Sequence, residues 1–270
     1  MGLFDVHAHL THPRLLPDVD AVLARAEAAG VSTIISNGLN PADNERTREL
    51  AARSKLVRPA FGLYPVDAVL PGMRAAGVDY PQEEGDEGPV PADEAVEWVR
   101  SHVDEAFAVG EIGLDGYWVP SEFREEQEAI FRRLVAIAME ADKPIIIHTR
   151  KREARCFEIL KELGAQRVDW HCFGGRVKLA RRIAEHGHYL SIPANARKNE
   201  GFTRMLETLP RDRVLLETDC PYLGPERGED NEPANVRVTA EYAAELWSES
   251  LESVEAKLAA NFERLFRAAP

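Results

Sequence analysis

Eight short apolar runs, rich in β-branched residues, recur along the 270-residue chain, and longer amphipathic stretches separate them. Runs that are almost continuously apolar are typical of strands buried on both faces, and hence of a parallel sheet with crossover helices. Eight such units, in a chain close to the usual length of about 250 residues, predict a closed (β/α)8 TIM barrel. The expected strands are Leu3–Leu10, Val31–Asn37, Val57–Leu63, Ala106–Gly110, Pro144–Thr149, Val168–Cys172, Tyr189–Pro193 and Val214–Asp219.

Capping residues support the intervening helices. Asn40 followed by Pro41 is typical of a helix start, and Ser121 predicts the start of a long helix over Glu122–Ala141. Two helical stretches after the eighth run, Glu232–Glu249 and Leu251–Arg267, indicate one extra helix at the C-terminus. Glycines are expected to end three further helices, at Gly30, Gly164 and Gly187. No linker divides the chain, so we expect a single domain over residues 1–270.

The segment 71–91 interrupts this alternation, because it is rich in acidic residues, glycine and proline. This composition predicts a flexible, solvated insertion after the third strand. Its position would place it at the carboxyl end of the barrel, where active sites lie. A lid over the site and an acidic surface loop without a role are equally good interpretations.

Composition and net charge bear on which classes of protein this chain can belong to. The formal net charge of −13 argues against a large nucleic-acid-binding face, but a narrow site with a few local cations stays compatible with it. No apolar run approaches the roughly 20 residues of a membrane span, and no signal sequence is evident. Three scattered cysteines predict no disulfide framework and favour a reducing, cytoplasmic location. Nothing indicates an obligate protein partner.

Residues of the types that bind metal ions lie where the expected strands end. His7 and His9 are two residues apart on the first strand, so both imidazoles point to the same face. The same pattern of residues at strand ends is repeated by Glu111, His148, His171 and Asp219. Each residue alone has an ordinary explanation, such as a core histidine or a turn-capping carboxylate. Because the strand ends of a barrel converge, however, the six together predict a site for two divalent cations, with zinc, manganese, magnesium, iron and nickel all admissible.

The other cysteines and histidines near these positions have simpler interpretations. Cys172 and Cys220 follow candidate ligands, but successive strand residues face opposite ways, so packing is expected for both. Four histidines lack the placement at a strand end and are expected to be ordinary: His12, His102, His186 and His188.

Five motifs in order resemble those of the TatD-like metal-dependent hydrolases, within the amidohydrolase superfamily. They are Asp5-x-His7-x-His9-Leu10, Gly110-Glu-Ile-Gly-Leu-Asp115, Pro144-x-x-x-His148, His171-Cys-Phe-x-Gly175 and Glu217-Thr-Asp219-x-Pro221. The resemblance covers nearly the whole chain and implies a (β/α)8 barrel with a two-metal site. It also implies that one metal is held by His7, His9, Glu111 and Asp219, and that Glu111 bridges to a second metal held by His148 and His171.

The third strand departs from the family pattern. Members usually carry Gly-x-His-Pro there, whereas this chain has Gly62-Leu63-Tyr64-Pro65. Tyr64 therefore stands where an imidazole could contact substrate phosphate, which puts the nuclease assignment in question and leaves the metal ligands intact.

The expected mechanism uses two cations to activate a water, with Asp219 taking its proton and passing it to the leaving group. Asp115 either orients a histidine or caps a turn. Basic residues on the loops of the same face suit a phosphate or another anion, although solvation explains them equally well. The candidates are Arg150 and Lys151, Arg176, and Arg197 with Lys198; Tyr117 and Trp118 could stack on a base, with packing as the simpler interpretation.

Three functions follow from these expectations. The first is a phosphodiesterase or deoxyribonuclease that acts on DNA at a free single-stranded end. The second is a hydrolase of a small ester, lactone or amide that uses the same two cations. The third, a non-catalytic metal-binding protein, is disfavoured because a structural site needs no bridging carboxylate.

Overall fold

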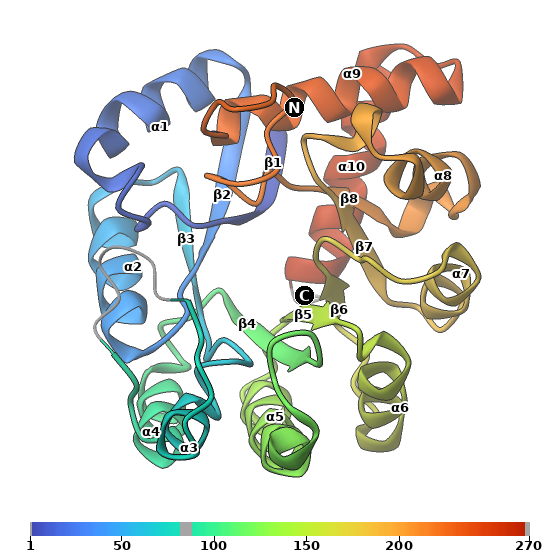
Figure 1. The fold of residues 1–270 in the computed structure, drawn as a ribbon. Coiled ribbons are helices and arrows are strands. Elements are labelled where there is room, and N and C mark those ends of the chain that lie inside the picture. Colours follow the sequence, from blue (N-terminus) through green and yellow to red (C-terminus); the bar gives the residue numbers. More distant parts are fainter. Residues whose placement is uncertain (1, 82–87, 268–270) are drawn as a thin grey trace.

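The computed structural model describes residues 2–81 and 88–267, and there eight parallel strands form one sheet in the order β1 to β8. Each strand pairs with the next one along the chain, and helices surround the sheet (Figure 1). The strands are β1 (Leu3–Ala8), β2 (Val31–Asn37), β3 (Val57–Phe61), β4 (Ala108–Asp115), β5 (Ile145–Arg150), β6 (Val168–Trp170), β7 (Tyr189–Ile192) and β8 (Val214–Leu216). The predicted (β/α)8 barrel is confirmed.

The barrel closes where β8 meets β1. The peptide N–H of Asp219 donates to the carbonyl of His7 at 2.8 Å, and the N–H of His9 donates to the carbonyl of Cys220 at 2.9 Å. Asp5 reinforces this seam, because its carboxyl group accepts from the N–H of Thr218 at 2.9 Å and from the Thr218 hydroxyl at 2.6 Å. The seam therefore joins the two ends of the sheet at the level of the candidate metal ligands.

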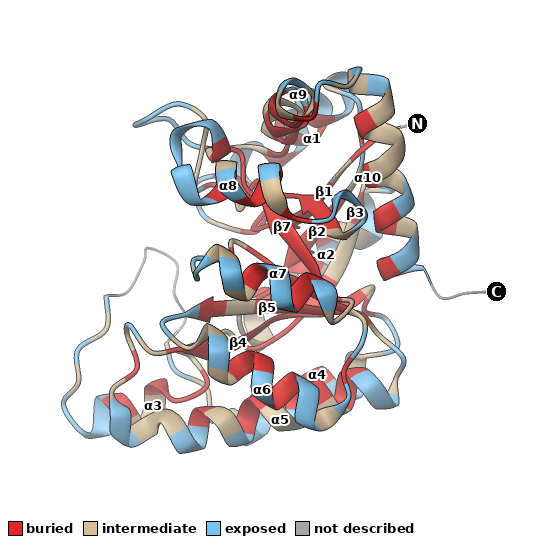
Figure 2. Ribbon diagram, turned by 90° about the vertical axis from the view of Figure 1, so that its right-hand side faces the viewer, coloured by how far each residue is buried: buried red, intermediate tan, exposed pale blue. Residues whose placement is uncertain are grey.

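Ten α-helices lie within the described residues. They are α1 (Val19–Ala28), α2 (Pro41–Arg53), α3 (Leu70–Ala75), α4 (Ala92–His102), α5 (Arg124–Glu140), α6 (Glu153–Leu163), α7 (Val177–Glu185), α8 (Glu200–Thr208), α9 (Val236–Trp247) and α10 (Leu251–Phe266). Their buried faces turn toward the strands (Figure 2). In the part of the chain that the structure describes, no helix is long and apolar enough to cross a membrane.

The capping predictions are partly right. The Asn40 side chain accepts from the N–H of Asp43 at 3.1 Å, and Gly164 ends α6 in the left-handed conformation with φ 75°. The prediction that Ser121 begins the long helix is wrong. Residues Ser121–Phe123 form a short 3-10 turn without a side-chain cap, and α5 begins at Arg124. Similarly, a 3-10 turn that begins at Pro233 delays α9 to Val236, four residues after the expected start.

The largest error in strand boundaries concerns β4. We expected Ala106–Gly110, whereas the strand runs from Ala108 to Asp115 with every residue buried. Gly113 lies inside the strand and so close to β5 that an added Cβ would stand 1.9 Å from the carbonyl oxygen of His148. Glu111 and Asp115 thus belong to the strand itself. At β6 and β8 the strands are shorter than expected, so His171 and Asp219 lie just beyond them.

The extra C-terminal helix, α10, covers the end of the barrel where the strands begin. Phe262 is buried, and its ring stacks on that of Phe4 with centroids 4.1 Å apart. Phe107 and Phe266 extend the same aromatic cluster. This end of the barrel is therefore filled with apolar side chains, which leaves the opposite end for the site.

The expectation for the insertion at 71–91 is wrong at its start. Residues Leu70–Ala75 form α3, with Leu70 and Met73 buried on one side of the helix. Pro71, taken as a loop residue, occupies the first turn, where the missing N–H costs nothing. Part of the predicted loop, 82–87, lies outside the described residues.

Candidate metal centre

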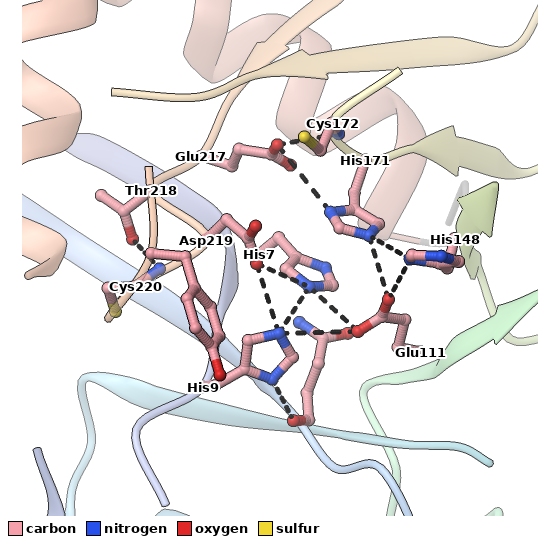
Figure 3. Close-up of polar contacts among 12 residues, drawn as sticks. His7, His9, Glu111, His148, His171, Cys172, Glu217, Thr218, Asp219 and Cys220 are labelled. Carbon is pink, nitrogen blue, oxygen red and sulfur yellow. Dashed lines mark hydrogen bonds and ion pairs between the residues drawn. The ribbon is translucent and has the colours of Figure 1, made fainter. Parts of the chain in front are cut away.

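His7 and His9 bring two imidazoles together at the carboxyl end of β1. Their Nε2 atoms are 3.2 Å apart, so the two side chains point the same way as the strand periodicity predicted (Figure 3). Both residues are buried. Because two ring nitrogens face one point at this distance, the pair forms one edge of a ligand set for a cation.

Glu111 lies between two pairs of imidazoles. Its Oε2 is 3.4 Å from Nε2 of His7 and 3.5 Å from Nε2 of His9. Its Oε1 is 2.8 Å from Nδ1 of His148 and 3.0 Å from Nε2 of His171. Each carboxylate oxygen therefore faces one histidine pair, which is the arrangement of a carboxylate that bridges two cations.

Asp219 completes the first of these ligand sets. Its Oδ1 is 3.3 Å from Nε2 of His9 and 3.7 Å from Nε2 of His7. The residue adopts a left-handed backbone conformation with φ 56°, which aspartate tolerates better than most residues. This conformation at the end of β8 turns the carboxylate back over β1.

The distances between these donor atoms fit a divalent cation. A tetrahedral ion with bonds of 2.0–2.1 Å places its ligand atoms about 3.3 Å from one another. In the first set, the separations among His7, His9 and Glu111 run from 3.2 to 3.5 Å, and Oδ1 of Asp219 lies 3.3 and 3.7 Å from the two imidazoles. In the second set, Glu111, His148 and His171, they run from 2.8 to 3.4 Å. The donor atoms of both groups are therefore spaced as divalent-cation ligands are, and Glu111 belongs to both groups.

Hydrogen bonds fix the orientation of the imidazoles from behind. Nδ1 of His9 lies 3.1 Å from the carbonyl of Asn37, and Nε2 of His148 lies 3.3 Å from Oδ2 of Asp115. Such partners select the tautomer that leaves the other ring nitrogen free for a metal. His7 and His171 stack face to face, with centroids 3.8 Å apart. The four rings are thus held in place by the strands around them.

A buried polar chain behind His171 was not predicted. Oε1 of Glu217 lies 3.9 Å from Nδ1 of His171 and accepts from the N–H of Cys172 at 2.8 Å. The Ser191 hydroxyl contacts Glu217 at 2.5 Å and Asp169 at 2.9 Å. A hydroxyl has one proton, so one of these carboxyl groups must carry a proton of its own. Burial favours this neutral form and raises the pKa of both, that of Asp169 to about 7.

Burial and neighbouring charges shift the pKa values of the titratable groups in the site. Burial, together with the neighbouring His171, lowers the pKa of His7 to about 3. Burial also opposes charge on His9, but the hydrogen bond with Asp219 and the charge of Glu111 outweigh it and raise the pKa of His9 to about 9. Burial alone would raise the pKa of Glu111, and the surrounding imidazoles instead hold it well below its usual range. Anionic carboxylates among imidazoles are the electrostatic environment that a cation requires.

A cleft of about 1410 Å³ opens over this centre. Among the residues predicted to bind substrate, Tyr64 and Arg150 line it, and Tyr64 packs edge-on against His148 with centroids 5.0 Å apart. Asp115 lies beneath the cleft, buried, as a hydrogen-bond partner of His148. Lys151 and Arg176 also line the cleft.

Arg197 and Lys198 lie elsewhere. Neither lines the cleft: Arg197 pairs with Glu245 at 2.6 Å, and Lys198 pairs with Glu226 at 3.0 Å. By contrast, no carboxylate among the described residues lies within ion-pair distance of the guanidinium of Arg150 or Arg176, or of the ammonium of Lys151. Arg46 also lines the cleft but pairs with Asp43 at 3.3 Å, so the cations that the described residues leave for an anion are Arg150, Lys151 and Arg176.

The comparisons with known proteins agree with this geometry. The sequence profile of the family described as TatD related DNase matches residues 4–267. The chain belongs to this family. It is accordingly a metal-dependent hydrolase, as the resemblance in sequence implied, and its histidine and glutamate clusters are candidate metal-binding groups.

TatD relatives extend over nearly the full chain. YabD of Bacillus subtilis, an uncharacterized metal-dependent hydrolase, is 34% identical over 98% of this chain and 99% of its own. Human deoxyribonuclease TATDN3 is 30% identical over 98% of this chain and 95% of its own. The solved structure of YjjV, a TatD homologue from Escherichia coli, has a TM-score of 0.83 at 25% identity and covers 99% of this chain and 98% of YjjV.

Sequence reasoning missed several residues of the cleft. Cys172 was expected only to pack, yet it lines the cleft, as do His12 and Tyr222. Glu217 lies two residues before Asp219, and this spacing was a signal available in the sequence. Cys172 follows β6 by two residues, His12 and Tyr222 belong to loops, and no pattern in the sequence distinguished these three.

Proposed function

We propose that this TatD-family hydrolase is a phosphodiesterase that removes nucleotides from a free single-stranded end of DNA. The two ligand sets that share Glu111 would hold two divalent cations. The observation that carries the proposal is the combination of this centre with Arg150, Lys151 and Arg176, which face the same cleft and have no carboxylate partner within residues 2–81 and 88–267. A phosphodiester supplies the anion that these side chains lack.

The chain's own groups have distinct tasks in this reaction. A bound pair of divalent cations supplies an acidic water and positive charge beside the scissile bond. Asp219, whose carboxylate lines the cleft, accepts the proton of the attacking water and passes it to the leaving oxygen. Glu111 stays buried and holds both ligand sets in register.

Substrate contacts are assigned to the rim of the cleft. Arg150 holds a phosphate oxygen through its planar guanidinium, and Lys151 and Arg176 add charge around it. Tyr64 offers a hydroxyl donor beside His148, at the position where the family usually carries histidine. Asp115 keeps the His148 ring in the tautomer that a metal requires.

The test is hydrolysis of a short single-stranded DNA and of a panel of small esters and lactones by metal-analysed protein, with Asp219→Asn alongside. Asparagine keeps the shape and the left-handed conformation but not the basicity, so we expect DNA cleavage to fall by about 10²–10⁴-fold. Metal content of the variant, measured on the same sample, separates loss of the base from loss of a cation.

Arg150→Ala separates the substrate classes. It is expected to raise the KM for DNA and to leave turnover of any small ester unchanged, whereas Arg133→Ala, on the exposed face of α5, changes neither. If fully metal-loaded protein hydrolyses only small esters or lactones, the metal centre stands and the nuclease proposal is wrong.

A further inference from the structure

Two exposed tyrosines face the cleft from opposite rims. Tyr117 is 53% exposed and Tyr222 is 36% exposed, and both line the cleft above the metal ligands. Tyr117 follows β4 and Tyr222 follows β8. In a closed sheet with the order β1 to β8, these strands are diametrically opposite, so the candidate metal centre lies between the two rings.

Each ring is paired with an arginine. The guanidinium of Arg150 lies 3.8 Å from the centroid of the Tyr117 ring, and that of Arg14 lies 4.9 Å from the Tyr222 centroid. His12 stands edge-on to Tyr222, with its Nε2 3.2 Å from the tyrosine oxygen. Aromatic rings and guanidinium planes are the surfaces on which unpaired nucleobases stack. We call Tyr117 with Arg150 the first platform, and Tyr222 with Arg14 and His12 the second platform.

Hydrogen bonds tie both platforms to the metal ligands. The N–H of Tyr117 donates to Oδ1 of Asp115 at 2.7 Å, and the other oxygen of Asp115 contacts His148. The N–H of Tyr222 donates to the carbonyl of Asp219 at 2.9 Å, and the Asn231 side chain donates to the carbonyl of Tyr222 at 2.7 Å. The backbone of each tyrosine is therefore fixed relative to the centre, so each ring projects into the cleft from a fixed point.

We propose that the cleft binds the nucleic acid strand on both sides of the bond that it cuts, with one base on each platform. This inference rests on the phosphodiesterase function proposed above and adds the second platform as a binding position for a base. The first platform contains Arg150, and Lys151 follows it along the rim of the cleft, so the phosphates that flank its base meet positive charge. Stacking is tolerant of base identity, so the strand is held without strict sequence preference.

The test measures how binding depends on strand length. Metal-loaded Asp219→Asn serves as the inactive background, and fluorescein-labelled oligothymidylates of increasing length are titrated by fluorescence anisotropy. Affinity is expected to rise with length until the strand reaches both platforms. Adding Tyr117→Ala or Tyr222→Ala should each weaken the longer strands by at least about fivefold, because loss of a stacked base costs about 1–3 kcal/mol. Met139→Ala, an exposed apolar side chain on α5 outside the cleft, is the matched control.

The position of each loss along the length series distinguishes the outcomes. Tyr222→Ala should affect only strands long enough to cross the centre, and in the active enzyme it should raise KM without lowering kcat. If Tyr222→Ala binds every length as the background does while Tyr117→Ala is impaired, one rim alone holds the strand and the inference is wrong. If the wild type cuts no DNA and the background binds none, the proposed function itself fails.

Discussion

His188 makes the stability of the fold depend on pH. Its ring is fully buried, Nδ1 accepts from the indole N–H of Trp170 at 3.1 Å, and Nε2 donates to the carbonyl of Ala165 at 2.9 Å. Both ring nitrogens therefore make hydrogen bonds in the neutral form. A proton added to Nδ1 would point at the indole N–H of Trp170 and break that hydrogen bond. Burial is the main reason that the pKa of His188 falls to about 4 from its usual 6.5.

The sign of the effect follows from linkage. Below pH 6.5 the unfolded chain binds a proton at His188, whereas the folded chain binds it only near pH 4. The free energy of unfolding therefore decreases as the pH is lowered from 6.5 to 4. The full difference of about 2.5 pKa units corresponds to roughly 3 kcal/mol, of which about 2 kcal/mol is lost between pH 7 and pH 5. That loss is a large fraction of the usual net stability of about 5–15 kcal/mol.

Urea unfolding of metal-free protein at pH 7, 6 and 5 measures this loss, with His188→Asn as the reference. Asparagine can still accept from Trp170 but does not titrate, so the variant should lose about 2 kcal/mol less than the wild type over this range. Other titrating groups contribute to both proteins and cancel in the difference. Equal losses in the two proteins would refute the assignment, and NMR titration of the His188 ring would then show a pKa near 6.5.

Two further predictions concern the closed end of the barrel and the second ligand set. Phe262→Ala removes a buried ring stacked on Phe4 and should lower the free energy of unfolding, measured in urea, by about 3–5 kcal/mol. The control Met139→Ala, at an exposed position, should change it by less than about 0.5 kcal/mol. A loss below about 1 kcal/mol for Phe262→Ala would contradict the packing described. Asp115→Asn should weaken metal binding by about 10–100-fold in competition with a chromogenic chelator, with exposed Asp93→Asn as control, and unchanged affinity would show that Asp115 only caps the turn.

The features that could be predicted from the sequence depend on local pattern. Continuous apolar runs identified the strands, and period-two spacing placed His7 beside His9, because both are properties of a single strand. Convergence of strand ends brought Glu111, His148, His171 and Asp219 together, because barrel topology requires it. The family resemblance and the fold are confirmed on these grounds.

The features that escaped prediction depend on distant partners. Arg197 and Lys198 follow β7 as expected, but Glu245 and Glu226 lie far along the chain and draw both cations away from the cleft. The extension of β4 through Gly113 was hidden because the close approach of β5 that requires glycine is visible only in three dimensions. Tyr222 is held through its own backbone groups, by the carbonyl of Asp219 and the side-chain amide of Asn231, and neither contact depends on the tyrosine side chain.

The seam between β8 and β1 has a consequence for biosynthesis. His7 and His9 leave the ribosome well before Asp219, so the hydrogen bonds of β1 to Asp219 and Cys220 become available only after β2 to β8 have emerged. A nascent chain thus carries the two imidazoles without the carboxylate that completes their ligand set. The candidate first ligand set comes into being in the same event that closes the sheet, so the complete set of donor atoms exists only in a finished barrel.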